Sequence, residues 1–205
     1  MKKQVLALLL ILALAFSLAS CGKPKSPYAG AKKADSLTIG GIDWWVVKVD
    51  EKEGKALLIT KDILKLMPYN EEWVDITWET SDMRAYLNGE FYDKTFTDEE
   101  KAWIAETELS NDVSIYENFD TDGGNNTVDK VFLLSLQEAR DYFVANKDRV
   151  AVLQGTTQNE EWWLRTPGRM SQRAASTVWE YGKASDAGSS AGNQKGLRPA
   201  MWILI

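Results

Sequence analysis

Histidine is absent from the 205 residues of the chain, and cysteine occurs once. Without histidine the chain lacks the commonest general base, the commonest metal ligand and every Ser-His-Asp or Cys-His catalytic arrangement. A single cysteine cannot form a disulfide within the chain. Most familiar hydrolase mechanisms are therefore excluded, and the fold must depend on its hydrophobic core.

Proline and glycine are also scarce, at 5 and 14 residues, while 44% of the residues are hydrophobic and 26% are charged. This composition is typical of a globular chain and excludes disorder and fibrous repeats. The formal net charge is -6, and no basic stripe interrupts the acidic chain. We therefore expect one domain and no nucleic-acid partner.

The chain begins with Lys2 and Lys3, followed by an apolar run over residues 5–16. This run is shorter than the roughly 20 residues of a spanning helix and is typical of an export signal. Residues 18–22, LASCG, resemble the lipobox of bacterial lipoproteins. The resemblance implies that a signal peptide over residues 1–20 is removed and that Cys21 carries a lipid. The protein would then be anchored to the membrane on the extracytoplasmic face of a bacterial cell envelope. The alternative is cleavage by another signal peptidase, with Cys21 as a free thiol or a disulfide partner.

Residues 21–33 are rich in Lys, Pro, Gly and Ala, without apolar periodicity, and predict a tether. Its lysines either solubilise a spacer or contact anionic lipid headgroups. We expect the folded domain to extend from Ala34 to Ile205.

The pattern of this domain predicts strands at both ends with helices between them, which favours an α+β fold over alternating βαβ units. Capping boxes begin at Thr97 and Ser135. The predicted strands are residues 37–39, 43–49, 55–60, 130–134, 162–165, 176–181 and 197–204. The predicted helices are residues 81–87, 101–108 and 135–145. Residues 168–174 and 184–196 are predicted to be long polar loops.

Five blocks of the chain look like the signature blocks of an uncharacterised domain of exported and lipid-anchored bacterial proteins. They are residues 44–47 (WWVV), 77–88 (TWETSDMRAYLN), 129–135 (DKVFLLS), 162–168 (WWLRTPG) and 196–203 (GLRPAMWI). That domain is distantly similar to the C-type lectin-like superfamily. The similarity implies mixed and antiparallel sheets, adjacent N- and C-terminal strands, about three helices, and ligand contacts from loops in the second half.

Little of that superfamily's chemistry carries over. The lectin calcium signatures and the paired cysteines of formylglycine-generating enzymes do not occur. Residues 188–192 match the pattern G-x-S-x-G, but this motif needs a strand-turn-helix setting and a histidine partner. We therefore assign no catalytic role to Ser190.

Two groups of carboxylates remain as enzymatic candidates for glycoside hydrolysis: Glu160 with Glu161, and Glu79 with Asp82. Neighbouring residues of a strand face opposite sides, so surface or ion-pair roles are favoured for them.

Arg84, Arg165 and Arg198 each lie within an otherwise apolar block. Because an unpaired buried charge is costly, structural ion pairs or hydrogen bonds to loop carbonyls are favoured for all three.

Tryptophan is abundant, with nine residues. Trp44, Trp103, Trp163 and Trp202 lie in apolar segments and are predicted to be core residues. Six aromatic residues have polar neighbours and are candidates either for an exposed platform or for packing under loops: Tyr69, Trp73, Trp78, Trp162, Trp179 and Tyr181. We predict a ligand-binding set of Trp162, Arg165, Trp179 and Tyr181, within a ligand-facing surface over residues 160–196.

Asp120, Asp122, Asn125 and Asp129 offer oxygen ligands at intervals around two glycines. Such a pattern suits a hard cation, and we keep calcium as a candidate ligand. The alternative is an Asx-rich turn held by side-chain-to-backbone hydrogen bonds.

The sequence thus predicts a surface-tethered lipoprotein that acts as a non-enzymatic binding module for glycans or surface proteins, without a required cofactor. A carboxylate-dependent glycan-processing enzyme and a purely structural envelope protein stay open as alternatives.

Overall fold

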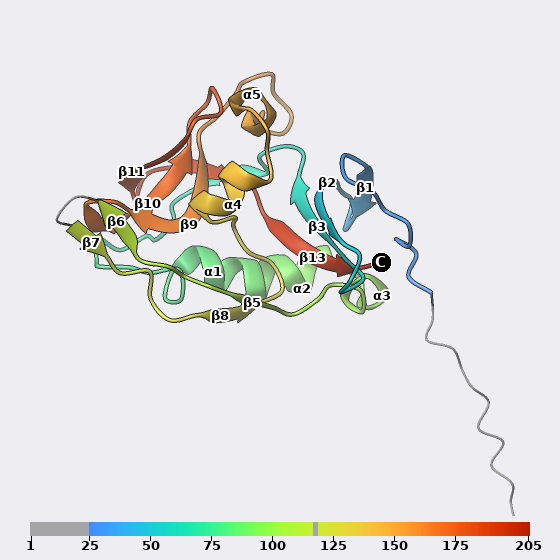
Figure 1. The fold of residues 1–205 in the computed structure, drawn as a ribbon. Coiled ribbons are helices and arrows are strands. Elements are labelled where there is room, and N and C mark those ends of the chain that lie inside the picture. The colour runs from blue at the N-terminus through green and yellow to red at the C-terminus, as the bar shows by residue number, and fades with distance from the viewer. Residues whose placement is uncertain (1–24, 117–118) are drawn as a thin grey trace, which may run out of the picture.

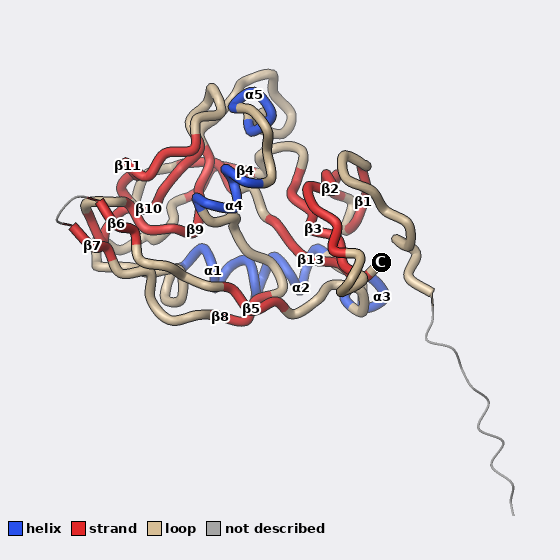
Figure 2. Tube along the Cα trace, viewed as in Figure 1, coloured by secondary structure: helices blue, strands red, loops and turns tan. Residues whose placement is uncertain are grey.

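The computed structural model describes residues 25–116 and 119–205. In this part of the chain the fold is α+β with mostly antiparallel sheets, as predicted (Figures 1 and 2). The predicted signal peptide, residues 1–20, and Cys21 lie outside the described residues.

The first sheet has the order β1-β2-β3-β13 and is antiparallel throughout. Its strands are β1 (Ser36–Ile39), β2 (Ile42–Asp50), β3 (Lys55–Thr60) and β13 (Ala200–Leu204). Gly40 and Gly41 connect β1 to β2 with φ values of 62° and 69°, a region in which residues with a Cβ are strained. The last strand, β13, lies in the same sheet as β1 but pairs with β3. The first and last strands are therefore not adjacent, contrary to our expectation.

The second sheet has the order β11-β10-β9-β12-β4. Its strands are β4 (Lys65–Met67), β9 (Trp162–Gly168), β10 (Ser171–Val178), β11 (Ala184–Ser190) and β12 (Lys195–Leu197). The prediction of long polar loops was wrong for most of residues 168–174 and for residues 184–190, because these small, polar segments are strands. Small residues suit this sheet, since a Cβ on Gly188 would lie 2.9 Å from the Cα of Gly168.

Two short antiparallel pairs complete the strands. β5 (Thr107–Leu109) pairs with β8 (Thr127–Asp129), and between them β6 (Ser114–Tyr116) pairs with β7 (Phe119–Thr121). Residues 130–134 were predicted to form a strand but are a mostly buried connection instead. Within it, Phe132 forms an isolated β-bridge with Ala200.

The predicted C-terminal strand over residues 197–204 is divided between the two sheets. Residues up to Leu197 belong to β12, and the chain enters β13 at Ala200. At the crossing point Arg198 is completely buried and donates to the carbonyl oxygens of Thr60 (3.0 Å), Arg149 (3.1 Å) and Lys61 (3.3 Å). Burial lowers the pKa of Arg198 to about 9, so its guanidinium still carries a charge at neutral pH. This arginine is structural, as predicted.

In the described residues the helical segments form four helices. The first is continuous and consists of α1 (Asp82–Tyr86), the π-helical η1 (Leu87–Phe91) and α2 (Tyr92–Thr95), which lie below both sheets in the view of Figure 1. The others are α3 (Asp98–Lys101), α4 (Leu136–Asp141) and α5 (Asn146–Arg149). The predicted capping boxes at Thr97 and Ser135 are confirmed. The helix predicted over residues 101–108 was wrong, because α3 ends where the chain enters a bridge from Ile104 to Ile203. No helix of the described part of the chain is long and apolar enough to cross a membrane.

The predicted tether is packed against the domain over its described part. The Ser26 hydroxyl donates to the carbonyl oxygen of Leu204 at 2.7 Å, and Tyr28 and Ala31 pack against the hydrophobic core. The backbone N–H of Ala34 donates to Val46 at 2.8 Å. Packing therefore begins at Ser26 and not at Ala34.

The hydrophobic core lies between the two sheets and the first helix. Its largest fully buried side chains include four tryptophans: Trp44, Trp78, Trp162 and Trp163. Trp103 and Trp202, also predicted to be core residues, are only partly buried.

Candidate functional site

A cleft of about 330 Å³ opens where the end of β9, the beginning of α4, β11 and the chain before β6 meet. We call it the polar cleft and define it by residues 110–114, 135–137 and 165–167 together with Arg140 and Asp186. The position of α4 is fixed by its N-cap, because Ser135 accepts from Glu138 N–H and Leu136 N–H donates to the Thr166 hydroxyl at 2.9 Å. The walls therefore come from four separate segments of the chain.

Arg165 is the most buried charged residue of the polar cleft, at 5% exposure. Its Nη1 donates to the Leu133 carbonyl at 3.0 Å and forms an ion pair with Glu138, and its Nη2 donates to the Ser110 carbonyl at 3.3 Å. Its Nε is buried and has no hydrogen-bond partner among the described residues. The predicted structural role is confirmed, and one donor of this arginine remains unused within the part of the chain that the structure describes.

Asn111 lies across the same cleft and has the complementary group. Its Nδ2 donates to the Asn125 carbonyl at 2.8 Å, which fixes the orientation of the amide. Its Oδ1 is buried and has no hydrogen-bond partner among the described residues. Buried polar atoms of proteins are rarely left in this state, and each costs about 1–3 kcal/mol. The polar cleft thus holds one unused donor and one unused acceptor.

Charged side chains of both signs also line the polar cleft. Arg140 is exposed and donates weakly to the Ala184 carbonyl at 3.4 Å. Asp186 forms an ion pair with Arg169 at 3.7 Å, and Asp112 accepts from the Ser110 hydroxyl at 2.6 Å. Such a mixture favours a ligand that both donates and accepts hydrogen bonds over a simple ion.

Trp179 and Tyr181 of the predicted ligand-binding set lie together in the turn between β10 and β11. Their ring centroids are 5.4 Å apart in an edge-to-face arrangement, and Tyr181 is 50% exposed. The Lys183 ammonium lies 4.9 Å from the Trp179 ring. We call residues 179–183 the aromatic turn; it does not border the polar cleft.

Trp162 does not belong to an exposed surface, and its prediction as a ligand contact is corrected. The ring is fully buried, its Nε1 donates to the Arg149 carbonyl at 3.0 Å, and the Arg198 guanidinium lies 4.9 Å above it. The indole ring packs against the buried guanidinium of Arg198, and its aromatic face offsets part of the cost of burying this cation. Tyr69 and Trp78 are buried as well, whereas Trp73 is 62% exposed.

Burial raises the pKa of Tyr69 above its ordinary value, so its hydroxyl stays protonated. The hydroxyl donates to the Arg165 carbonyl at 3.2 Å. Tyr69 therefore supports the backbone of β9 beside the polar cleft.

Three of the four predicted calcium ligands have separate partners. Asp129 is buried and accepts from Arg84 Nε (2.7 Å), Trp78 Nε1 (2.8 Å) and the Thr127 hydroxyl (2.8 Å). Asp122 accepts from Gly124 N–H at 2.9 Å, and Asn125 donates to Glu79 at 2.9 Å. Asp120 is exposed in β7. The bond between Asp122 and Gly124 N–H is of the side-chain-to-backbone kind expected for an Asx-rich turn, whereas the bonds named for Asp129 and Asn125 join side chains. The described residues contain no group of three or more acidic or cysteine side chains that could hold a metal ion. Calcium binding here stays a prediction.

The carboxylates considered for catalysis are also engaged. Glu161 forms an ion pair with Lys195 at 2.6 Å, and Asp82 accepts from Glu71 N–H at 2.9 Å. Ser190 ends strand β11, so the G-x-S-x-G pattern is not in a strand-turn-helix setting.

The predicted ligand-facing surface over residues 160–196 includes Arg165 and Asp186, but the sequence missed Asn111 and Arg140, which come from two other segments of the polar cleft. No local pattern marks them, because their proximity is created by the tertiary fold.

A family model described as a domain of unknown function, DUF6273, matches residues 53–205. The chain belongs to the DUF6273 family. The prediction of an uncharacterised domain family is thus confirmed. No curated protein and no solved structure matches the chain.

The DUF6273 match includes every residue of the polar cleft and of the aromatic turn. It begins in the turn before β3, so β1 and β2 lie outside it. Both candidate surfaces therefore belong to the DUF6273 region, whereas the packed N-terminal segment does not.

Proposed function

We propose that this DUF6273 protein is a lipid-anchored binding module of the bacterial cell envelope, and that the polar cleft binds its ligand. The observation that carries the proposal is the pair of unused buried atoms, Arg165 Nε and Asn111 Oδ1. Both atoms are shielded from solvent, so a ligand reaches them through a local movement of the side chains that cover them. A ligand that then accepts from the first and donates to the second removes two unfavourable terms from the folded state.

The chemistry of the polar cleft favours a neutral sugar. A hydroxyl both donates and accepts hydrogen bonds, so one polyol can satisfy both unused atoms and both signs of charge at the rim. The volume of about 330 Å³ lies at the small end of ligand pockets, which suits a mono- or disaccharide unit. Because the cleft is small and polar, we expect dissociation constants between micromolar and millimolar.

The C-type lectin-like resemblance is part of this proposal. The placement of β13 in the same sheet as β1 supports it, as does the location of the polar cleft at strands of the second half. The aromatic turn would offer a second contact surface, on which the faces of sugar rings could stack against Trp179.

Nuclear magnetic resonance of the chain from residue 22 onward tests the site directly. The Nε–H signal of Arg165 should move on addition of neutral mono- and disaccharides, because this donor gains an acceptor. The Nε–H signal of Arg198, which already donates to Thr60, is the matched internal control. Asn111→Ala should weaken the response at least fivefold, since each polar contact contributes about 1 kcal/mol.

Three results would contradict parts of the proposal. No movement of the Arg165 signal with any saccharide excludes the polar cleft as a sugar site. If only the signals of Trp179 and Tyr181 move, the sugar binds at the aromatic turn and not in the polar cleft. Equal movement of Arg165 and Arg198 signals indicates a general change of the fold.

The anchor needs its own test. Mass spectrometry of the mature native protein should show a diacylglyceryl group on Cys21, and Cys21→Ala should release the protein or leave it unprocessed. An unmodified thiol at Cys21 would refute lipidation without affecting the sugar site.

A further inference from the structure

The packed N-terminal segment leaves little chain between the proposed lipid and the domain. Ser26 is fixed by its hydrogen bond to Leu204, and Tyr28 packs against the core. The five peptide units from Cys21 to Ser26 span at most about 18 Å when fully extended. A lipid on Cys21 would therefore hold this side of the domain close to the membrane surface.

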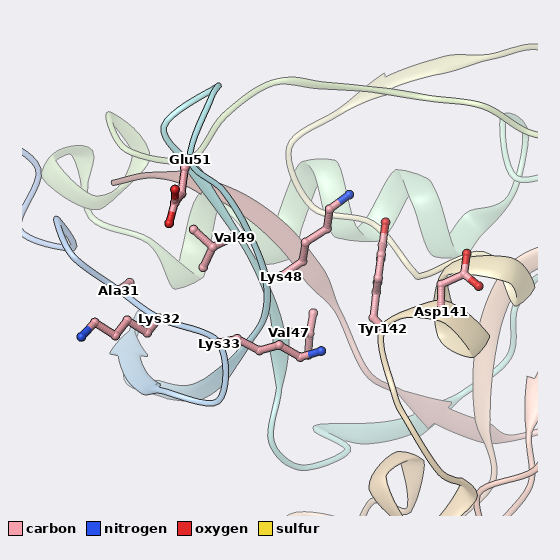
Figure 3. Close-up of a pocket in the computed structure, with 9 residues that line it drawn as sticks. All are labelled: Ala31, Lys32, Lys33, Val47, Lys48, Val49, Glu51, Asp141 and Tyr142. Atoms are coloured by element: carbon pink, nitrogen blue, oxygen red, sulfur yellow. The ribbon is translucent and has the colours of Figure 1, made fainter.

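The N-terminal segment is basic although the chain as a whole is acidic. Residues 21–34 contain four lysines and no acidic residue, against a net charge of -6 for the full chain. The segment borders two adjoining hollows of about 540 and 480 Å³ that share Lys33, Val47 and Tyr142. Figure 3 shows the first of them, between the N-terminal segment, β2 and the end of α4.

We call the two hollows together the lysine groove, after Lys32, Lys33, Lys48 and Lys147, which line it. Within the described residues, none of these four ammonium groups has a carboxylate oxygen within ion-pair distance. Three carboxylates, Glu51, Asp141 and Asp148, line the groove as well, so four positive and three negative side chains leave a net charge of +1. Asp148 accepts from Ala145 N–H at 2.9 Å and Asp141 accepts from the Gln137 amide at 2.8 Å. The lysines thus remain available to an external anion.

One apolar side chain projects beside these lysines. Val144 lines the second hollow and is 93% exposed, more than any other exposed large hydrophobic residue of the described chain. It lies in the connection between α4 and α5, with Tyr142 before it and Lys147 after it. An exposed apolar residue among lysines and partly exposed aromatic rings is typical of a surface that rests in a lipid interface.

We propose that the lysine groove and Val144 contact anionic lipid headgroups. The lysines attract the phosphates, and Val144 enters the boundary between headgroups and acyl chains. This inference rests on the proposed lipid anchor, because the anchor would bring the domain to a membrane. Its test does not need the anchor, since binding to vesicles is measured with the unlipidated chain. The beginning of α4 lines the polar cleft and its end lines the lysine groove, so this short helix separates the two surfaces.

Vesicle co-sedimentation tests the proposal with the unlipidated chain from residue 22 onward, which keeps every described residue. It should bind vesicles that contain phosphatidylglycerol and should not bind vesicles of phosphatidylcholine alone. Lys33→Gln combined with Lys147→Gln should weaken binding about 30-fold, because each lysine near an anionic surface contributes roughly fivefold.

Matched controls come from residues that do not line the lysine groove. Lys94→Gln combined with Lys130→Gln removes the same charge from lysines that already have carboxylate partners. Val144→Ser should weaken binding, whereas Val128→Ser, at a position 60% exposed on β8, should not.

The outcomes separate this inference from the proposed anchorage. Equal losses in the two lysine pairs, or no binding to phosphatidylglycerol vesicles, would overturn the lysine groove as a lipid-contacting surface. Selective loss in the Lys33 and Lys147 variant supports it even if Cys21 proves to be unmodified.

Discussion

Replacement of Asp129 by Asn should destabilise the protein strongly, because the buried carboxylate serves three donors at once. The bond from the Arg84 guanidinium, at 2.7 Å, contributes about 1.5–3 kcal/mol, and those from Trp78 and Thr127 contribute about 1 kcal/mol each. An amide presents one oxygen and one NH₂ group, so at least one donor would then face another donor. The expected loss of unfolding free energy is about 3–5 kcal/mol, as for other buried pairs that lose one partner.

Urea denaturation and thermal melting measure this loss, which should lower the melting temperature by roughly 10 °C for a chain of this length. Asp120→Asn, in the same loop but exposed, is the control and should change stability by less than about 0.5 kcal/mol. A melting temperature for Asp129→Asn within the error of the wild type would refute the role of this carboxylate.

Calorimetry with millimolar calcium tests the prediction of a cation site in the same loop. Heat of binding that the wild type shows and Asp120→Asn lacks would demonstrate a site.

Three further changes test other parts of the fold. Removal of residues 202–205 should abolish the cooperative unfolding transition, because it deletes three of the five residue pairs between β13 and β3; an unchanged melting temperature would contradict this. Gly182→Ala should cost more than about 2 kcal/mol, since φ is 86° and the new Cβ would meet a backbone oxygen at 1.8 Å, whereas Gly41→Ala, with φ of 69° and open space, should cost only about 1 kcal/mol. Burial raises the pKa of Tyr142 to about 12, so the protein should lose stability as pH rises from about 10 to 12. In urea titrations, Tyr142→Phe should lose about 1 kcal/mol less unfolding free energy than the wild type over this pH range. This figure is smaller than the full pKa shift implies, because the ring is partly exposed to solvent.

Local patterns predicted the elements that local interactions determine. The hairpin of β1 and β2 follows from its paired glycines, and the beginnings of α3 and α4 follow from capping boxes at Thr97 and Ser135. Lengths were predicted less well. The helix expected beyond Lys101 ends there because the next residues gain more from contacts with β13 than from continued helix.

Tertiary contacts determine the elements and site residues that local sequence patterns did not predict. Residues 131–134 are apolar because the core surrounds them, and apolar runs of this kind do not distinguish a strand from a buried connection. Trp162 and Trp179 have similar polar neighbours in the sequence, yet only the former lies over a buried arginine. Of the predicted ligand-binding set, only Arg165 lines the polar cleft, and Asn111 reaches it from another part of the chain.

The pairing of β13 with β3 has a consequence for the order in which the protein can fold. Ala200 pairs with Ile59, so the first sheet closes a loop of roughly 140 residues, at an entropic cost of about 4 kcal/mol. Contacts this distant in sequence slow folding, because the loop must close before they can stabilise the chain. The first sheet therefore lacks one of its edges until β13 has been made, and the core that it shares with the second sheet is completed only then.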